Sequence, residues 1–404
     1  MRGLLRTLGL LFALVQAVWV ALSLYQSAIA LVGRARQGQP RSRPVATPRF
    51  FVAVCARNEE AVVGRIVGDL QAQTYPADLF DIVVVAHNCV DRTASVARAA
   101  GVDVVEIETS RPGKAMAVRA ALRAAPASCD FLGVFDADAR VPATLLAQVA
   151  AASAGEDCLQ VETVPHHSSE WLGEGYGLGR RVRNAFWWRP REALGLGTTI
   201  SGCGWFIRPA IVAELMPRLR TLTEDLEFTA RLYANGRKVA YVSSTYVTVE
   251  ESHQLGPSVQ QRARWARGHL LVVLHEWPAV VRRALSGDLR ALDLALYLIA
   301  PTRMLTRVAV SLSFLLTIVS APFALPLSIV SVALAGEWIL PLYVSLRDGL
   351  LPANVGGLKL AARHTVLNVL WFPIGFWALL TTGSRTWTAM PRTKDEDSDA
   401  TAAA

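Results

Sequence analysis

The sequence predicts an α/β fold: a mixed, mostly parallel sheet with helices on both faces, joined to apolar helices that can cross a membrane. Three observations predict it. Apolar strand-like runs alternate with helix-like runs through residues 50–150. Polar residues stand directly after several of these strands, where ligands bind in parallel sheets. Long apolar stretches lie near both ends, and 52% of the 404 residues are hydrophobic, more than is usual for a soluble protein.

The alternation of strands and helices begins at residue 50. Strands are expected at residues 50–56, 81–86, 103–108 and 131–135. Helices are expected at residues 59–73, 93–100 and 114–125, and from residue 142. The polar side chains just past the strand ends are those of Arg57, Asn58, Asp91, Asp136 and Asp138. Because the carboxyl ends of parallel strands share one edge of the sheet, we expect these residues to meet there.

Two glycine-rich segments follow the alternation. Four glycines at alternate positions between residues 173 and 179 match no nucleotide-binding loop pattern, and we expect a flexible loop there. Ser201-Gly202-Cys203-Gly204 predicts a tight turn. After this turn, residues 226–234 predict a helix that ends at Asn235-Gly236.

The first apolar stretch, residues 8–32, carries no charge and would span roughly 37 Å as a helix, at about 1.5 Å per residue. Ala28-Ile29-Ala30 also suits cleavage of a signal peptide. The run is longer than the apolar part of a signal peptide, and four arginines follow it between residues 34 and 43. We therefore expect a retained transmembrane helix, with the downstream chain on the cytoplasmic side.

Apolar stretches return after residue 289. Membrane segments are expected at residues 308–319, 325–344 and 365–382, and three or four later spans fit the sequence. Residues 291–300 are too short to span, and we expect them at the membrane interface or as an extension of the next helix. The tail beyond residue 393 is polar and acidic and is expected to be disordered.

Charge and cysteine content exclude several classes of protein. The net charge is +8, and many arginines flank the apolar stretches, which suits an anionic membrane surface. The sequence contains no nucleic-acid-binding motif, so we expect no nucleic-acid partner. The five cysteines include no Cys-x-x-Cys pair, so neither a disulfide framework nor a structural zinc site is expected. This pattern fits a reducing, cytosolic domain.

Asp136 and Asp138 are the candidates for binding a metal ion. Residues two apart in an extended segment face the same side. Two neighbouring carboxylates repel each other unless a cation lies between them. We therefore expect Mg²⁺ or Mn²⁺, shared with substrate phosphates. A solvated pair of acids in a turn is the alternative, and the apolar strand directly before the pair speaks against it.

Two later segments can also carry chemistry. Glu224 and Asp225 precede the helix expected at residues 226–234, where acids also complement the helix dipole. Gln261, Arg264 and Trp265 stand at i, i+3 and i+4, on one helix face. There, the arginine can bind a diphosphate and the tryptophan can support a sugar or base. The same face also suits a basic amphipathic helix on a membrane surface, with the tryptophan as its anchor.

These motifs occur in an order that resembles membrane-bound family 2 glycosyltransferases, over about residues 50–270. The segments that resemble the family's motifs are Ala56-Arg57-Asn58-Glu59-Glu60, the stretch that ends in Asp91-Arg92-Thr93, Gly113-Lys114-Ala115, Asp136-Ala137-Asp138, Ser201-Gly202-Cys203-Gly204, Thr223-Glu224-Asp225 and Gln261-Arg262-Ala263-Arg264-Trp265. The last segment matches the Gln-x-x-Arg-Trp motif of membrane-embedded, often processive members.

The resemblance implies a nucleotide-diphospho-sugar transferase fold of the GT-A type and a role for each matching residue. The catalytic residues would be Asp225, as general base, and Glu224. The donor-binding residues would be Arg57, Asn58, Glu59, Asp91, Lys114, Asp136 and Arg264. Asp136 and Asp138 would hold Mg²⁺ or Mn²⁺. The acceptor-site residues would be Gln261, Trp265, Gly202, Cys203 and Gly204.

The resemblance also implies an inverting transfer of sugar from a nucleotide sugar, in the first place a UDP-sugar, to a saccharide or lipid-linked acceptor at the plasma membrane. The Gln-x-x-Arg-Trp motif favours a processive polysaccharide synthase, whereas the small number of spans leaves room for a single addition to a lipid. A transporter or scaffold with a nucleotide-binding domain is the rival from another class. Glu337, inside an apolar stretch, favours that rival.

The chain thus divides into six expected segments. They are a transmembrane helix (1–34), a linker (35–48), a cytosolic glycosyltransferase domain (49–270), interfacial helices (271–302), C-terminal transmembrane helices (303–384) and a basic, then disordered tail (385–404).

Overall fold

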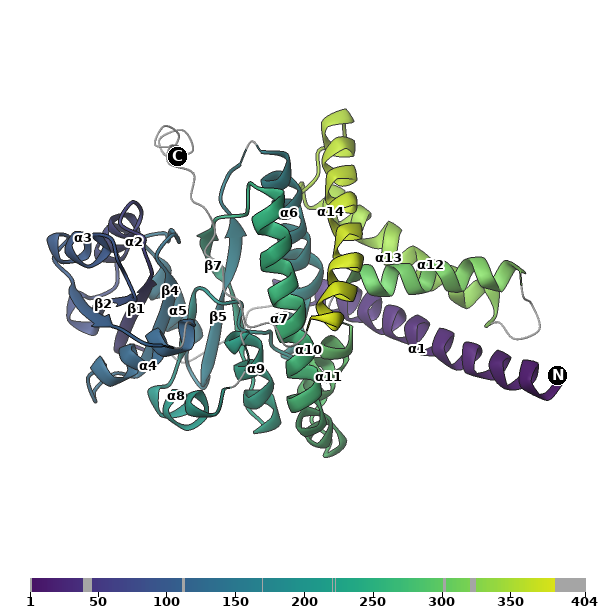
Figure 1. The fold of residues 1–404 in the computed structure, drawn as a ribbon, viewed down its shortest axis with the longest axis horizontal. Coiled ribbons are helices and arrows are strands. Elements are labelled where there is room, and N and C mark those ends of the chain that lie inside the picture. The colour runs from purple at the N-terminus through teal and green to yellow at the C-terminus, as the bar shows by residue number, and fades with distance from the viewer. Residues whose placement is uncertain are drawn as a thin grey trace.

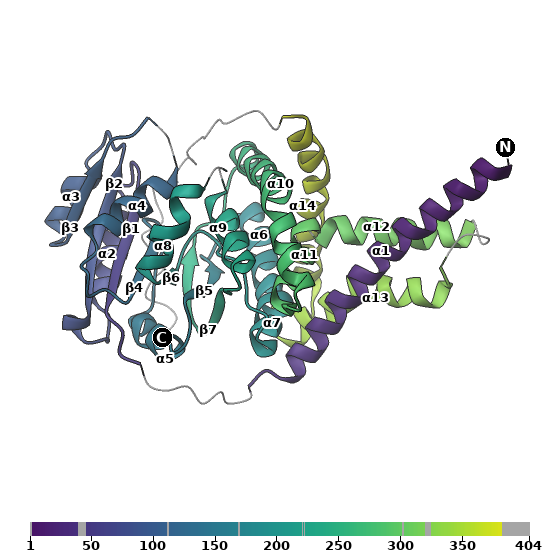
Figure 2. The ribbon, with the colours of Figure 1, turned by 90° about the horizontal axis from the view of Figure 1, so that it is seen from below.

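The computed structural model describes residues 2–38, 46–110, 113–168, 170–219, 221, 223–300, 303–319 and 325–381. Three parts follow one another along the long axis: a sheet with its covering helices, a layer of long helices, and an arm of apolar helices (Figure 1). The view from below shows the same order (Figure 2). The arm combines the N-terminal helix with two helices from late in the chain, so segments far apart in sequence lie side by side in it.

The sheet has seven strands in the order β3-β2-β1-β4-β6-β5-β7. They are β1 (Phe50–Ala56), β2 (Phe80–His87), β3 (Asp103–Ile107), β4 (Phe131–Asp136), β5 (Cys158–Pro165), β6 (Trp205–Ile207) and β7 (Ala240–Val249). Strand β6 is antiparallel to β4 and β5, and every other pair is parallel. The predicted mixed, mostly parallel sheet is confirmed.

Helices cover both faces of the sheet, as predicted. One face carries α2 (Val63–Gln71), α3 (Thr93–Ala99) and α5 (Leu145–Ala152), and the other carries α4 (Lys114–Ala124), α8 (Pro209–Leu215) and α9 (Glu224–Ala234). Short 3-10 turns lie at η1 (Ala77–Leu79) and η3 (Met216–Arg218). Each face forms its own buried apolar cluster, and removing that apolar surface from water stabilises the domain.

The layer of long helices joins the sheet to the arm. It contains α6 (Trp171–Arg183), the π-helix η2 (Asn184–Trp188), α7 (Arg189–Leu194), α10 (Leu255–Leu285), α11 (Leu289–Ile299) and α14 (Val355–Leu380). Helix α10 continues without a break through residue 270, where the sequence suggested a domain boundary. Helix α11, expected at a membrane interface or as an extension of the next helix, buries Ala291, Leu294 and Leu298 in the apolar cluster of the sheet. The globular part therefore extends to about residue 299.

The glycines between residues 173 and 179 lie in α6, so the prediction of a flexible loop is wrong. A Cβ added to Gly175 would come within 2.6 Å of Leu367, and one added to Gly179 within 2.7 Å of His364. Both neighbours belong to α14. The glycines therefore permit α14 to pack directly on the α6 backbone, which is a packing reason that strand and helix periodicity do not reveal.

The arm consists of α1 (Arg2–Ala35), α12 (Arg303–Val319) and α13 (Leu327–Arg347). In the described part of the chain, two helices are long and apolar enough to cross a membrane, Gly9–Ala35 and Leu327–Arg347; the apolar part of α12 is shorter. Helix α14, where we expected a span at residues 365–382, is not among them and stands at a steep angle to α1 in Figure 1. The expected linker lies partly outside the described residues, and the expected tail wholly so.

A buried ion pair fastens the long helices to one another. Arg191 of α7 donates to Asp293 of α11 through Nε (2.8 Å) and Nη2 (2.9 Å), and its guanidinium stacks 3.9 Å from the centre of the Trp187 ring. Tyr25 of α1 donates its hydroxyl proton to the same carboxylate at 2.9 Å. One carboxylate thus connects the N-terminal helix, α7 and α11.

Replacing this carboxylate tests how much the junction contributes to stability. In Asp293→Ala, the Arg191 guanidinium stays buried without its partner, which should lower the free energy of unfolding by about 3–5 kcal/mol. The measurement is denaturant unfolding of the purified protein in detergent. The double variant Arg191→Met/Asp293→Leu should recover most of the loss because it leaves no buried charge; a double variant as unstable as the single one would contradict this account.

Candidate active site

The polar residues predicted at the strand ends do meet at one edge of the sheet. In the register of β1, Cys55 lies opposite Asp136 of β4, and Ala56 lies opposite Ala86 of β2. The loops that follow these three strands therefore begin at the same level. Two groups of side chains form there, one after β4 and one after β1 and β2.

The first group is centred on Lys114, at the start of α4. Its ammonium donates to a carboxylate oxygen of Asp136 and to the carbonyl oxygen of Gly202. A small pocket beside it is lined by Lys114, Val118, Ile200, Gly202, Trp205, Met216, Glu224, Asp225 and Phe228. Burial lowers the pKa of this lysine, but the charge of Asp136, the neighbouring Cys55 and Cys203 and the hydrogen bond to Asp136 together outweigh burial, so the pKa lies above its usual value. The lysine is therefore a permanent cation at the centre of the site.

Glu224 and Asp225 face this cation from the first turn of α9. Burial raises the pKa of Glu224, the charge of Asp225 raises it further, and the result is about 7. Burial also raises the pKa of Asp225, while a 2.8 Å hydrogen bond from the Leu226 N–H and the charge of Arg264 oppose that rise. The pair thus holds a carboxyl that is half protonated near neutral pH beside one that ionises more easily, a division typical of sites that move protons.

Arg264 supplies the second cation, from α10. Its charge lowers the pKa of both Glu224 and Asp225, so it lies within electrostatic reach of both carboxylates. Gly268, one turn further along α10, explains this placement. A Cβ at that position would lie 2.4 Å from Thr223, the residue that precedes α9. The missing side chain lets α10 approach the start of α9 closely enough for Arg264 to face its acids.

The other two residues of the Gln-x-x-Arg-Trp segment are on the same helix but make different contacts. Trp265 is 36% exposed, and its ring stacks on that of Trp371 from α14, with the centroids 6.5 Å apart. Gln261, one turn earlier, is partly exposed. Trp265 therefore belongs to the junction between α10 and α14, whereas Arg264 belongs to the acidic pocket.

Asp136 is the last residue of β4, and Asp138 lies two residues further on, in the turn that follows the strand. Burial raises the pKa of the Cys203 thiol, and the negative charges of Asp136 and Asp138 add to that rise, so both carboxylates lie near this sulfur. In the part of the chain described, no three His, Cys, Asp or Glu side chains form a metal site. Two carboxylates nevertheless fit Mg²⁺ or Mn²⁺, because such ions take their remaining ligands from phosphate and water.

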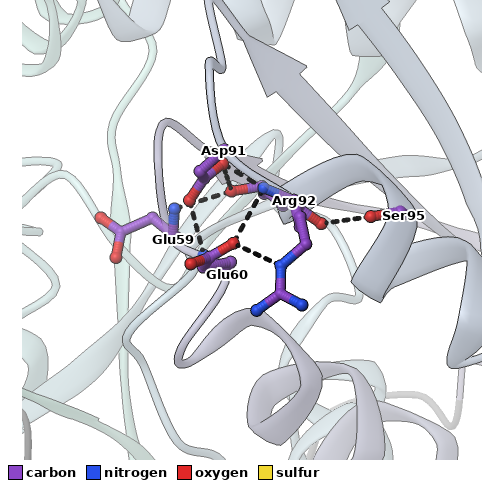
Figure 3. A network of polar contacts seen from close by, with 6 residues as sticks. Glu59, Glu60, Asp91, Arg92 and Ser95 are labelled. Atoms are coloured by element: carbon purple, nitrogen blue, oxygen red, sulfur yellow. Dashed lines mark hydrogen bonds and ion pairs between the residues drawn. The ribbon is translucent and has the colours of Figure 1, made fainter.

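The second group lies after β1 and β2, and it contains Arg57, Asn58, Glu59 and Asp91. Asp91 accepts hydrogen bonds from the Glu60 N–H at 3.1 Å and the Thr93 N–H at 3.0 Å, and Arg92 donates from N–H and Nε to Glu60 (Figure 3). Burial disfavours the charge of Asp91, but the hydrogen bonds that Asp91 accepts lower its pKa. Asn58, at φ +57°, accepts from the Val90 N–H at 2.9 Å. The two loops thus hold each other in place and keep an ionised carboxylate at the sheet edge.

The segment Ser201–Gly204 is held by a residue that the sequence patterns missed. Gln160, 2% exposed in the middle of β5, donates from Nε2 to the Cys203 carbonyl (2.8 Å) and accepts the Ser201 N–H at Oε1 (2.9 Å). The visible signal was a glutamine inside an apolar strand, which must find buried partners. The Cys203 side chain is itself buried, and its sulfur accepts the Asp136 N–H at 3.4 Å. The thiol is therefore enclosed beside the end of β4, and the place of Cys203 at an acceptor site stays a prediction.

The structure therefore brings Lys114, Asp136, Glu224 and Asp225 together around Gly202, with Arg264 within electrostatic reach of the two acids of α9. The group of Arg57, Asn58, Glu59 and Asp91 lies on the neighbouring strands of the same edge. The arrangement offers fixed cations for a diphosphate, a pair of carboxylates for a metal ion, and a second pair for proton transfer.

Comparison with known proteins gives the same picture. Residues 48–268, more than half of the chain, match the family described as Glycosyltransferase like family 2. A β-monoglucosyldiacylglycerol synthase of Synechocystis sp. is 30% identical over 262 residues, which cover 62% of this chain and 54% of that protein. A probable glycosyltransferase of Bacillus subtilis, YdaM, is 25% identical over 257 residues, 56% of each chain. The chain thus spans about half the length of the curated relatives that it matches.

A mannosyltransferase of Pyrobaculum calidifontis, solved with GDP-Man and Mn²⁺, is similar in structure. Its TM-score is 0.55 at 17% sequence identity, and the match covers 91% of this chain and 98% of that one. At this level of identity the likeness shows a common fold. That fold includes the long helices beyond the family match.

Removing the side chain that holds the Ser201–Gly204 segment should loosen it. In Gln160→Leu, the Ser201 N–H and the Cys203 carbonyl lose their partners, at about 1–3 kcal/mol for each unsatisfied group. Amide hydrogen exchange of peptides that cover residues 201–204 should accelerate, as measured by mass spectrometry. Gln148→Leu, on the partly exposed side of α5, is the matched control. Unchanged exchange in Gln160→Leu would show that other contacts hold the segment.

Proposed function

This chain belongs to the glycosyltransferase like family 2, and on that premise we propose that it transfers one sugar from a nucleoside diphosphate sugar to the hydroxyl of a membrane lipid. The observation that carries the proposal is that Asp225 shares a pocket with the cation Lys114 and lies within electrostatic reach of Arg264, at the carboxyl edge of the sheet. A carboxylate there can take a proton, and the cations can stabilise a diphosphate that leaves beside it.

The reaction follows from these charges. Asp225 accepts the proton of the acceptor hydroxyl, and the acceptor oxygen forms a bond to the anomeric carbon of the donor. The bond between that carbon and the phosphate oxygen breaks, and the electron pair leaves with the nucleoside diphosphate. One displacement of this kind inverts the anomeric configuration, so an α-linked donor gives a β-linked product.

Glu224 supports this step from the adjacent position. With a pKa of about 7, it is protonated in part of the population at neutral pH. A neutral carboxyl can donate a hydrogen bond without repelling the neighbouring carboxylate. It therefore keeps Asp225 ionised while the acceptor binds.

The donor occupies the edge between the two groups of side chains. Arg57, Asn58, Glu59 and Asp91 would contact the nucleoside, most simply a uridine, and Lys114, Asp136 and Arg264 would contact the diphosphate. Asp136 and Asp138 would hold Mg²⁺ or Mn²⁺, which supplies positive charge to the phosphates when bound. The first of these carboxylates is already bound by Lys114, so Asp138 is the more available ligand.

The relatives favour a lipid acceptor and a single addition, because the matched curated proteins include glucosyldiacylglycerol synthases. A processive polysaccharide synthase is the second candidate, favoured by the Gln261-Arg264-Trp265 pattern. Trp265, however, stacks on Trp371 instead of facing the acid pair. We therefore place the single addition first.

The site would work at the cytosolic face of the plasma membrane. Helices α1 and α13 have the length and composition to span a bilayer, and α12 packs against both. Arg34, at the end of α1, pairs with Asp348 after α13, so this end of the two helices is polar. The basic residues that follow α1 in sequence favour the cytosol for that end.

The proposal predicts a strict requirement for the Asp225 carboxylate. Purified protein in phospholipid vesicles, given UDP- and GDP-sugars with and without Mn²⁺, should release nucleoside diphosphate and form a lipid that carries one sugar. Asp225→Asn should lower kcat by about 10²–10⁴-fold, the usual contribution of a general base. Donor binding, measured by calorimetry, should persist in this variant.

Asp103→Asn, at an exposed position on β3, is the matched control and should keep full activity. Near-normal turnover of Asp225→Asn would show that Asp225 is not the general base. A product with many sugars on each acceptor would contradict a single addition and favour a processive synthase. Absence of nucleoside diphosphate release from every donor, with folded protein, would overturn the proposed function itself.

The charge of Arg264 should set the pH at which the site becomes active. It lowers the pKa of both Glu224 and Asp225, so Arg264→Met should raise both values. A base with a higher pKa is ionised only at higher pH, and the acidic limb of kcat/KM against pH should therefore move to higher pH. Arg282→Met, an exposed arginine of α10, should leave the limb in place. If the acidic limb does not move in Arg264→Met, the charge of Arg264 does not act on Glu224 and Asp225.

A further inference from the structure

One side of α14 is apolar and exposed along most of the helix. Its side chains recur at intervals of three or four residues, which places them on one face. This outer face of α14 consists of Leu358, Ala362, Val366, Val369, Phe372, Phe376 and Leu380. Phe376 is 63% exposed and Leu380 72%, so the described part of the chain leaves the outer face uncovered.

The opposite side of α14 packs on the globular part of the protein. Arg363 forms an ion pair with Glu174 of α6, and the glycines of α6 bring the two helices close together. Trp371 stacks on Trp265 of α10. These contacts fix the rotation of α14 about its own axis, so the outer face points away from α6 and α10.

The outer face looks towards the side from which the arm projects. In both views α14 runs across the long axis of the molecule, whereas α12 and α13 run roughly along it (Figure 1 and Figure 2). Helices α6 and α10 lie on the side of α14 nearer the sheet, and α12 contacts α14 on the side of the arm. The arm is itself apolar and exposed, for example at Leu315, Ile318 and Ile339. The apolar surface of the arm therefore continues onto α14.

This arrangement suits a helix that lies in the plane of a membrane surface. Such a helix buries its apolar face about 5–10 Å into the boundary between headgroups and acyl chains. A helix that crosses the bilayer needs apolar sides all round, whereas α14 carries Arg363, His364 and Asn368 on the side away from the outer face. A second copy of this chain on the outer face would have to occupy the space that surrounds the arm.

We propose that α14 lies flat on the bilayer and binds the lipids through its outer face, without crossing the membrane. This inference rests on the membrane location in the proposed function, and it replaces the span expected at residues 365–382 by a surface helix. Arg267 of α10 donates to the Thr381 hydroxyl at the end of α14, at 3.3 Å. The bilayer therefore sets the height of α10, and with it that of Arg264, above the lipid acceptors.

Depth measurements along the outer face test this orientation. The full-length variants Ala362→Cys, Val369→Cys, Phe376→Cys and Leu380→Cys are each labelled with a nitroxide and reconstituted into phosphatidylcholine vesicles. Collisions of the nitroxide with dissolved oxygen and with a water-soluble nickel chelate give its depth, and the wild type, labelled in the same way, gives the background from the native cysteines.

All four positions should report a similar depth, about 5–10 Å below the headgroup boundary. The first and last positions are about 27 Å apart along the helix, at about 1.5 Å per residue. In a crossing helix the depth would therefore change steadily along the series and reach the bilayer centre, about 15 Å below the boundary.

Two further positions keep this test separate from the proposed function. Val18→Cys, at an exposed position within α1, should lie deeper than any position of α14, and Asp103→Cys, on β3, should lie in water. A depth series that crosses the bilayer would overturn the inference, as would a nitroxide at Phe376 that contacts water or is shielded from both colliders by a second copy. With Val18 still deep, the membrane location would stand. If the nitroxide at Val18 also contacts water, the membrane location and this inference fall together.

Discussion

The contact of Lys114 with Asp136 and with the Gly202 carbonyl is the interaction on which the rest of the site depends. It joins the end of β4 to the segment before β6 and places a permanent cation next to Glu224 and Asp225. Without that cation, the pocket would hold acidic side chains around a small volume, and burial would force more of them to take up protons. With it, and with the charge of Arg264, one carboxylate can stay ionised at neutral pH. The chemistry is therefore set by a balance of buried charges from four separate elements.

Small residues allow the elements that carry these charges to approach one another closely. Gly268 lets α10 contact Thr223, and Gly202, at φ +85°, lets the backbone before β6 turn towards Lys114. The glycines of α6 have the same effect on a larger scale, because they allow α14 to lie directly on that helix. In each case the missing side chain brings a charged or aromatic neighbour from another element into place. The helices thus pack through close contact with the backbone at glycines as well as through apolar side chains.

The sequence predicted the sheet and its polar edge, because short-range patterns of apolar and polar residues determine both. Alternating apolar runs predicted the strands of the sheet. The polar residues after β1, β2 and β4 predicted one shared edge, because the carboxyl ends of parallel strands lie at the same edge of a sheet. The glycines of α6 misled the prediction, since their spacing reflects contact with α14, about 190 residues later. Gln160 was missed for the same reason. Its partners, Ser201 and Cys203, are distant in sequence, and no periodicity records such contacts.

The extent of α10 and α11 explains why the site cannot be understood from the family match alone. That match ends at residue 268, whereas α10 continues to Leu285 and α11 returns to bury Leu298 in the cluster of the sheet. The same α11 holds Asp293, which binds Arg191 and Tyr25, and Tyr297, whose ring packs on those of Trp187 and Trp188 in η2. One helix beyond the matched region therefore fastens both the N-terminal apolar helix and η2. Any movement of the arm relative to the sheet would disturb these buried contacts, because α11 also packs its apolar side chains in the cluster of the sheet, so the arm and the sheet are coupled through α11.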